Sequence, residues 1–206
     1  MPVTGHQYPV FLTVSGRRCL VVGGGAVALR RAEGLVAAGA SVRVVAPRVL
    51  QLLRELHDVT VEERPYRRGE AAGHWLVVAA TDDPAVNRAV ADDGEAAGVW
   101  VNRVDDAAAG SFTVPAVARR GPVTVAVTTG GRSPSLAAWL GRHVEHELGP
   151  EHLTLLELVS ERRRTKGVEG AGPDAGSWQE LLDSGMLELI RAGRIAEARE
   201  RLTTCL

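Results

Sequence analysis

The sequence predicts an α/β protein built on a Rossmann-like, doubly wound parallel sheet. Three observations favour this fold class. Short apolar runs alternate with amphipathic stretches in the first half of the chain, as in successive β-α-β units. The first run, 18–22, stops at Gly23-Gly24-Gly25, and an alanine-rich stretch of helical spacing follows it. Further on, 74–80 is apolar without interruption, as expected for a parallel strand covered on both faces.

The glycine-rich turn is the strongest functional signal. It has the pattern G-x-G-x-x-A, with Gly23, Gly25 and Ala28 at the fingerprint positions of a dinucleotide-binding turn. Gly23 allows the tight turn, Gly25 lets phosphates approach the backbone, and Ala28 has only to permit close packing of helix on strand. Backbone N–H groups and the helix dipole together attract a pyrophosphate. An ordinary glycine turn is the alternative, but the strand, helix and strand (41–46) around it favour nucleotide binding.

One residue of the dinucleotide pattern is missing. The second strand normally ends in an Asp or Glu that bonds the ribose hydroxyl, but here 41–46 is followed by Pro47 and Arg48. Backbone at Ala46 and Pro47 is one alternative ribose contact. Arg48 is either a contact for a 2′-phosphate or a solvated loop cation, so these residues leave NAD and NADP open.

The remaining elements of the first half follow from local signals. We expect a helix over 47–56 and strands at 59–64 and 99–101. A further helix should run from Pro84 to near Gly98, because Asp83 is a suitable N-cap and proline suits the first helical position.

The pattern changes after Asp106. The β-like runs 111–115 and 122–129 follow one another with no helix between them, which indicates an antiparallel pair outside the parallel sheet. A helix should run from 134 to a break at Gly149-Pro150. The sequence thus predicts a nucleotide-binding domain (1–112), a small β/α element (113–149) and a helical domain (150–206).

The helical end has its own boundary signals. The stretch 166–176 is rich in glycine and predicts a loop. Ser177-Trp178-Gln179-Glu180 matches a capping box, which predicts the start of a helix there. Gly193 should separate that helix from the last one.

Composition excludes several classes of protein. The net charge is −1 and aromatic residues make up 4%, so nothing indicates binding to nucleic acid or to a membrane surface. Neither of the 2 cysteines belongs to a C-x-x-C pair, so a disulfide framework or zinc site is not expected. His143 and His146 lack a third ligand nearby and are expected at the surface. No signal-like or membrane-spanning run is present, so we expect a cytoplasmic protein.

Three polar clusters could carry chemistry. Thr81 follows the fourth strand and is a candidate nucleotide contact, beside the capping residue Asp83. Asn102 to Asp106 follow the fifth strand, where a carboxylate could take a proton from a substrate, or where the residues merely form a polar loop. In the 130–134 loop, Arg132 could bind a carboxylate, whereas a serine before a proline, Ser133, is also an ordinary helix start.

These features occur together, in order, in one known family. The chain resembles the precorrin-2 dehydrogenase/sirohydrochlorin ferrochelatase family, the NAD-dependent part of siroheme synthase. The features shared with this family are 8–12, 22–25 with Val27, Ala28 and Arg31, 45–47, 79–83, 102–105, Ser111-Phe112 with Pro115, and 128–134. They extend over about two-thirds of the chain, and the helical end carries no diagnostic motif.

The resemblance implies oxidation of the tetrapyrrole precorrin-2 to sirohydrochlorin, with NAD as hydride acceptor, in siroheme or cobalamin biosynthesis. It places a general base at Asp105. The cofactor contacts it implies, together with those from the turn, are Gly23, Gly24, Gly25, Ala26, Val27, Pro47, Arg48 and Thr81. The substrate contacts are Asn102, Arg103, Ser111, Arg132 and Ser133.

The resemblance also implies an interlocked homodimer formed through the small β/α element.

Precorrin-2 carries carboxylates, so Arg119 and Arg120 are additional candidate contacts besides their expected place in a turn. Arg103 departs from the family pattern, in which an apolar residue is usual, and could pair with Asp105 or with a substrate carboxylate. Some relatives also insert iron into the product, and the sequence leaves open whether this protein does so.

The alternative function is a non-enzymatic NAD(H)-sensing module. Such a module would share the first βαβ unit but usually keeps the acidic ribose ligand.

Overall fold

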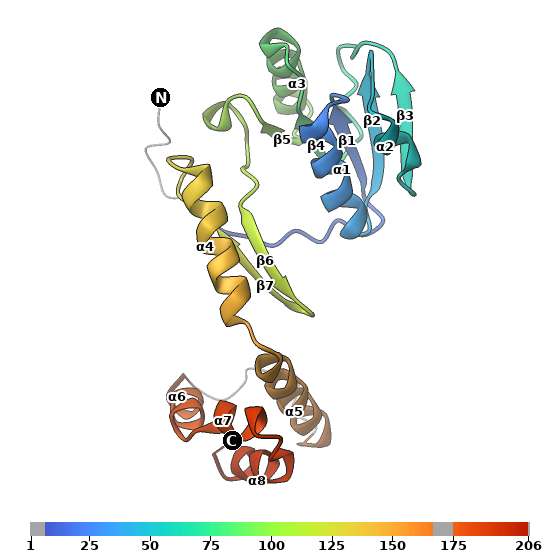
Figure 1. Ribbon diagram of the computed structural model, residues 1–206. Coiled ribbons are helices and arrows are strands. Elements are labelled where there is room, and N and C mark those ends of the chain that lie inside the picture. Colours follow the sequence, from blue (N-terminus) through green and yellow to red (C-terminus); the bar gives the residue numbers. More distant parts are fainter. Residues whose placement is uncertain (1–6, 167–174, 206) are drawn as a thin grey trace. The chain divides into compact units, whose positions relative to one another are not determined.

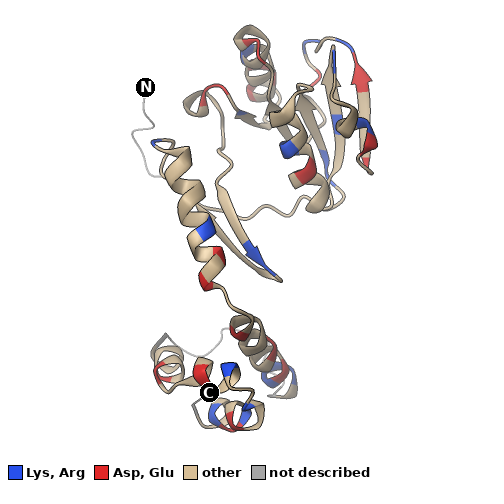
Figure 2. Cartoon of the chain, in the orientation of Figure 1, with Lys and Arg blue, Asp and Glu red and all other residues tan. Residues whose placement is uncertain are grey.

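The computed structural model describes residues 7–166 and 175–205 of the 206-residue chain (Figure 1). The chain forms two compact units, Met1–Val114 and Pro115–Leu206. Charged residues of both signs are dispersed over both units, in keeping with the small net charge (Figure 2). The three-part division at 112 and 149 stays a prediction.

The first unit is built on a five-stranded parallel sheet. Its strands are β1 (Arg18–Val22), β2 (Ser41–Ala46), β3 (Val59–Glu63), β4 (Leu76–Ala79) and β5 (Trp100–Arg103). They lie in the order β3-β2-β1-β4-β5. From β1 the chain adds β2 and then β3 on one side of the sheet. It then returns to the other side of β1, where β4 and β5 lie, so the strand order reverses between β1 and β4. Ligands of such sheets bind beyond the carboxyl ends of the strands at this switch point.

Helices cover both faces of the sheet (Figure 1). Side chains alternate between the faces, which explains why the central strands are apolar throughout. On one face, Cys19 and Val21 pack with Ala28 and Ala32 of α1 (Ala26–Ala37) and with Leu53 of α2 (Gln51–Glu55). On the other face, Leu20, Val22 and Val77 pack with Val90 of α3 (Pro84–Ala96). The predicted Rossmann-like sheet is confirmed.

Most predicted elements of this unit are present with shifted ends. The helix expected over 47–56 is only Gln51–Glu55, and the strand expected over 74–80 is Leu76–Ala79. Asp83 caps α3 as predicted, its Oδ1 accepting a hydrogen bond from the Ala85 N–H at 2.8 Å. A short 3₁₀ turn, η1 (Ala107–Ala109), follows β5.

The β-like run predicted at 111–115 is wrong. These residues have no strand structure, and the next strand, β6, begins at Ala116. The reason lies in their partners: the Ser111 N–H donates to the Val101 carbonyl at 2.8 Å, and the Phe112 carbonyl accepts from the Asn102 side chain. These few hydrogen bonds hold the segment beside β5, without the regular hydrogen-bond ladder that a strand would form.

The second unit begins with an antiparallel hairpin, β6 (Ala116–Arg120) and β7 (Val123–Val127), as predicted for a pair outside the main sheet. Arg119 and Arg120, which we expected in the turn, lie at the exposed end of β6 instead. Helix α4 (Pro134–Glu147) packs along the hairpin (Figure 1). The contact is close: a Cβ on Gly141 would lie 3.6 Å from the Ala116 Cβ.

In the described part of this unit, α4 is followed by the helices α5 (Pro150–Lys166), α6 (Ala175–Asp183), α7 (Met186–Arg191) and α8 (Ile195–Cys205). They share an apolar core made of Leu155, Leu158, Val159, Leu181, Met186, Leu189, Ile190, Ala198 and Leu202. None of the helices in the described ranges is long and apolar enough to cross a membrane.

The helix boundaries in this part differ from those predicted. Helix α6 begins at Ala175, so the capping box at Ser177 is wrong and Ser177 lies inside the helix. A break that we did not predict separates α6 from α7 at Gly185, whose φ of 80° suits glycine. Most of the loop predicted over 166–176, residues 167–174, lies outside the described residues.

Candidate active site

The glycine turn after β1 is shaped by close approaches of backbone. Gly23 has a φ of 133°, and a Cβ there would strike the Ala80 carbonyl at the end of β4. A Cβ on Gly24 would strike the Arg48 carbonyl, and the Gly24 carbonyl accepts a hydrogen bond from the Leu50 N–H at 2.9 Å. These two glycines let the turn fit between the ends of β2 and β4.

Gly25 differs from its neighbours because nothing lies within 4 Å of where its Cβ would be. It is the N-cap of α1, with no side-chain cap and no acidic residue in the first helical turn. Within the described part of the chain, the N–H groups of Gly25, Ala26 and Val27 have no hydrogen-bond acceptor. An exposed set of donors at the positive end of a helix suits a pyrophosphate, so these residues fit a dinucleotide.

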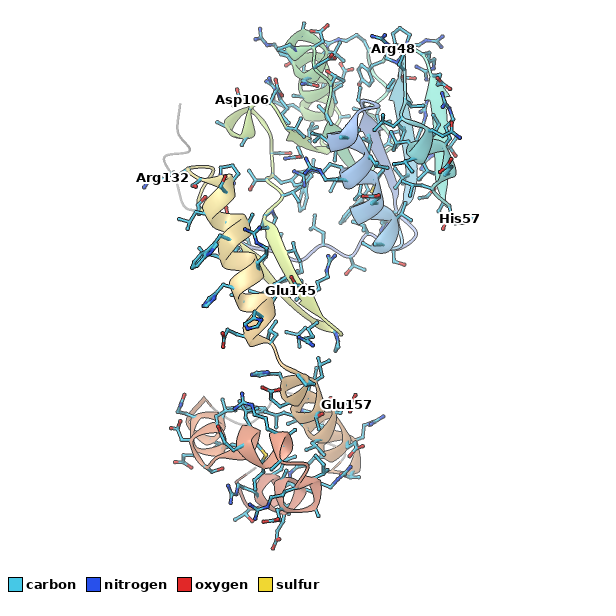
Figure 3. The ribbon with its side chains drawn as sticks, viewed as in Figure 1. Arg48, His57, Asp106, Arg132, Glu145 and Glu157 are labelled. Atoms are coloured by element: carbon cyan, nitrogen blue, oxygen red, sulfur yellow. The ribbon has the colours of Figure 1, made fainter. Side chains whose placement is uncertain are left out.

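The loop after β2 borders this turn. Pro47 and Arg48 are exposed, and the Arg48 side chain lies at the surface (Figure 3). The Arg48 backbone meets Gly24, so this loop is placed beside the proposed phosphate site. No carboxylate ends β2, as the sequence already showed.

Thr81, after β4, is held by a residue that sequence reasoning missed. The Asn87 Oδ1 accepts hydrogen bonds from the Thr81 backbone N–H (3.1 Å) and hydroxyl (2.8 Å). The Asn87 Nδ2 donates to the Thr81 carbonyl at 3.0 Å. Asn87 is fully buried, and the only signal that could have found it is a polar residue among the apolar positions of a predicted helix.

Asp105, after β5, forms a forked ion pair with Arg103. The Arg103 Nε and Nη2 donate to the two carboxylate oxygens at 3.2 and 2.7 Å. Arg103 is only 7% exposed, whereas the Asp105 side chain is 24% exposed. The Arg103 hydrogen bond lowers the pKa of Asp105, with a smaller contribution in the same direction from Asn87. Of the two alternatives for Arg103, the pair with Asp105 is the one present.

Two residues that we predicted as substrate contacts, Asn102 and Ser111, form hydrogen bonds within the protein near β5. Asn102 is 4% exposed, and its Nδ2 donates to the Phe112 carbonyl at 3.0 Å. The Ser111 hydroxyl accepts from the Val101 N–H at 2.6 Å. These bonds fasten the segment that follows Asp105 to β5, so both side chains are engaged within the protein.

Arg132 and Ser133 lie in the second unit. Ser133 caps α4, its hydroxyl accepting from the Leu136 N–H at 3.2 Å, which is the ordinary helix-start role. Arg132 is exposed at the tip of the loop, after Gly130 and Gly131, which both have positive φ (Figure 3).

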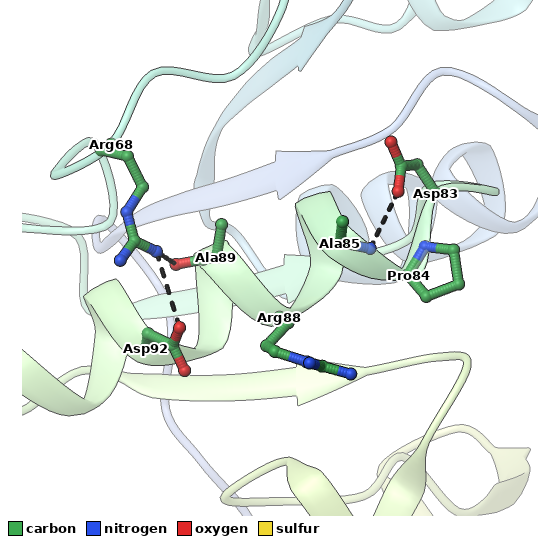
Figure 4. Close-up of a pocket in the computed structure, with 7 residues that line it drawn as sticks. All are labelled: Arg68, Asp83, Pro84, Ala85, Arg88, Ala89 and Asp92. Atoms are coloured by element: carbon green, nitrogen blue, oxygen red, sulfur yellow. Dashed lines mark hydrogen bonds and ion pairs between the residues drawn. The ribbon is translucent and has the colours of Figure 1, made fainter.

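A surface hollow of about 470 Å³ lies along α3 (Figure 4). Arg68 crosses it and donates to the Ala89 carbonyl at 2.7 Å, with Asp92 at 3.7 Å. None of the predicted contact residues lines this hollow. Across 7–166 and 175–205, no three His, Cys, Asp or Glu side chains gather as metal ligands.

The reversed strand order, the glycine turn and the open N-terminus of α1 define a dinucleotide-binding protein of the Rossmann class. Residues 10–116 match the protein family described as putative NAD(P)-binding, and the chain belongs to this family.

The chain is also similar to siroheme synthases. It is 40% identical over 205 residues to that of Chromobacterium violaceum, covering 95% of this chain and 43% of the relative. It is 37% identical over 207 residues to that of Nitrosococcus oceani, covering 97% and 44%. The chain thus spans less than half the length of these relatives.

Among solved structures, the chain is similar to one described as SirC, precorrin-2 dehydrogenase. The identity is 26%, the TM-score is 0.71, and the match covers 97% of this chain and 98% of the other. The predicted resemblance and the predicted fold class are therefore confirmed.

Proposed function

We propose that this protein is an NAD-dependent dehydrogenase that oxidises precorrin-2 to sirohydrochlorin in the cytoplasm. The observation that carries the proposal is the open N-terminus of α1 at the switch point of the sheet. It occurs in a chain that matches a precorrin-2 dehydrogenase over almost the full length of both proteins. No finding favours the NAD(H)-sensing alternative.

The nucleotide would be held at the carboxyl edge of the sheet. The N–H groups of Gly25, Ala26 and Val27 would bind its pyrophosphate, and the backbone at Pro47 would border its ribose. When bound, NAD supplies a hydride acceptor. Its nicotinamide half would extend past Thr81 toward the end of β5, since dinucleotides lie across the switch point.

Asp105 is the carboxylate that would take up the proton. The reaction removes one hydride and one proton from the reduced macrocycle, so the protein has to provide a proton acceptor beside the hydride acceptor. Its pairing with Arg103 keeps Asp105 ionised at neutral pH and fixes its orientation. Asn102 and Ser111 would support the wall of this site.

The Asp105 role is tested by exchanging it for an isosteric amide. We expect Asp105→Asn to lower the rate of NADH formation about 100-fold or more, the usual contribution of a general base. Asp106→Asn is the matched control, because Asp106 is the adjacent carboxylate and only caps η1. Equal rates in wild type and Asp105→Asn, measured anaerobically with precorrin-2 and NAD, would remove Asp105 from the mechanism.

The dimer that the resemblance implies belongs to the same proposal. Helix α4 presents Leu136 (48% exposed) and Trp139 (53% exposed), and His143 stacks on the Trp139 ring. From Pro134 to Gly141 the helix carries no charged residue (Figure 2). An exposed apolar stripe of this kind suits contact with a second copy of the chain.

A further inference from the structure

We infer that Arg31 of α1 binds a carboxylate of the tetrapyrrole substrate. The identity of this ligand rests on the proposed function, whereas the unpaired charge that requires a ligand is a property of the free protein. Arg31 is not among the cofactor or substrate contacts that the glycine fingerprint and the family resemblance imply.

The Arg31 guanidinium is held partly inside the protein without an acceptor for its Nε. This nitrogen is buried and, in the part of the chain that the structure describes, has no hydrogen-bond partner. The residue as a whole is half-buried, so part of its side chain stays open to a ligand. A cation taken partly out of water costs free energy until an acceptor or an opposite charge reaches it.

The other arginines of the first unit that are not exposed, within its described residues, each have a carboxylate partner. They are Arg43, Arg64 and Arg103, and each donates to a glutamate or aspartate at 2.7 Å or less. These hydrogen bonds raise the pKa of all three guanidinium groups. For Arg31, burial and then the charge of Arg30 lower the pKa instead. Arg31 therefore lacks the anion that the fold supplies to the other three.

Arg31 lies on the flank of α1 that faces β4. Ala28 and Ala32 are buried against the sheet, and Arg31 leaves the helix on the side of Val27, one turn earlier. Helix α1 connects β1 to β2, and β4 lies on the other side of β1. In a right-handed crossover of this kind, the Val27 side of the helix faces away from β2 and toward β4.

This flank borders the site proposed for the reaction. Val27 packs against the same apolar cluster as Val104, the residue directly before Asp105. Side chains of a helix lean toward its N-terminus, so Arg31 extends toward the carboxyl edge of the sheet, where α1 begins. A substrate lying between the nicotinamide and Asp105 would therefore have a carboxylate within reach of the guanidinium.

A carboxylate is the ligand that suits this position. A guanidinium can bind a carboxylate through two parallel N–H bonds, and precorrin-2 carries carboxylates around its ring. The other anion at this edge would be the pyrophosphate of NAD. The N–H groups at the start of α1 would hold that group, whereas Arg31 lies on the side of the helix, more than one turn further along.

The test measures equilibrium binding of sirohydrochlorin to the full chain, anaerobically and without NAD. Oxidation removes only hydrogen from precorrin-2, so sirohydrochlorin keeps its carboxylates and serves as the probe. We expect Arg31→Gln to weaken this binding about 10-fold or more, the usual loss for a hydrogen bond to a charged group. Arg30→Gln, the same exchange at the exposed neighbouring residue, should leave the binding unaltered.

The affinity for NAD, measured by calorimetric titration, separates a substrate contact from a cofactor contact. It should be equal in wild type and Arg31→Gln. The inference is overturned if a folded Arg31→Gln binds sirohydrochlorin as tightly as wild type, or if its NAD affinity falls as much as its sirohydrochlorin affinity.

A second variant keeps the test decisive if Arg31→Gln does not fold. Arg31→Lys retains the charge but not the forked geometry, so it should weaken sirohydrochlorin binding several-fold. Wild-type affinity in Arg31→Lys would then overturn the inference.

Activity separates this inference from the proposed function. Arg31→Gln should raise the KM for precorrin-2 with little change in kcat, because the carboxylate is bound equally before and during the reaction. Wild-type protein that binds sirohydrochlorin through Arg31 but forms no NADH would contradict the proposed function and support the role of Arg31. Wild-type protein that forms NADH, while Arg31→Gln binds sirohydrochlorin normally, would do the reverse.

Discussion

At the scale of single residues, the site depends on what each glycine of the turn has beside it. Gly23 and Gly24 face the carbonyls of Ala80 and Arg48, so they are required by the fold. Gly25 faces open space, so the fold itself does not require a glycine there. The fingerprint assigns the tight turn to Gly23 and the phosphate approach to Gly25 and leaves Gly24 unspecified, although Gly24 also faces backbone atoms.

This difference predicts opposite behaviour of two alanine exchanges. Gly24→Ala should lower the free energy of unfolding by about 1–3 kcal/mol, because backbone must move to admit the methyl group. Gly25→Ala should change it by less than about 0.5 kcal/mol but weaken NAD binding, since the methyl group would occupy the approach to the donors.

Urea unfolding and calorimetric titration with NAD measure the two effects. Gly34→Ala, on the open side of α1, is the control, and it should keep full NAD affinity. Tight NAD binding by Gly25→Ala would contradict the assignment of the phosphate site.

The residues at the carboxyl ends of β4 and β5 were only partly predictable. The sequence places Thr81, Arg103 and Asp105 after strands, because strand ends are local features of a chain. It does not show that Asn87 reaches Thr81, or that Ser111 bonds to β5, because those contacts depend on tertiary packing. The same limit explains the wrong strand at 111–115.

At the scale of elements, the outer strands are joined by a charge network. Arg43 of β2 and Arg64, which follows the edge strand β3, both bond to Glu62 of β3, and both also bond to Glu70 in the next loop. The hydrogen bonds from Arg43 and then Arg64 lower the pKa of Glu62 to about 2, and that of Glu70 is also lowered. The network ties β3, which lies at one end of the described sheet, to β2 and to the following loop.

This network predicts an acid-dependent loss of stability. A carboxyl whose pKa is lower in the folded protein than in the unfolded chain stabilises the fold fully above the unfolded value of about 4.3. That stabilisation should disappear as the pH falls from about 4.3 toward 2. Glu62→Gln should therefore flatten the dependence of the free energy of unfolding on pH in that range.

Urea unfolding at a series of pH values measures this slope. Glu33→Gln, an equal charge change on α1, serves as the control and should keep the wild-type slope. A wild-type slope in Glu62→Gln would show that the network does not contribute.

At the scale of the whole molecule, the chain combines a nucleotide-binding unit with a unit of different construction. The second unit has its own apolar core and a helix, α4, with exposed Leu136 and Trp139. The sequence predicted the order of these parts well, because glycine and proline mark their ends. It missed the break at Gly185, which has helical residues on both sides, and it placed the start of α6 at Ser177, which lies inside the helix.

The exposed stripe on α4 predicts how the protein assembles. Trp139→Arg should convert a dimer into a monomer, because it places a charge in the proposed apolar contact. Light scattering during size-exclusion chromatography measures the mass. Leu182→Arg, which makes a comparable exchange at an exposed position of α6, should remain dimeric. A monomeric wild-type protein at micromolar concentration would contradict the proposed dimer.

The most direct test of the proposed function is the reaction itself. Purified full-length protein is incubated anaerobically with precorrin-2 and NAD, and NADH and sirohydrochlorin are followed together by their absorbance. We expect both products to form in equal amounts, since each substrate molecule loses one hydride. Protein that binds NAD but forms neither product would contradict the proposed function and would leave nucleotide sensing as the better description.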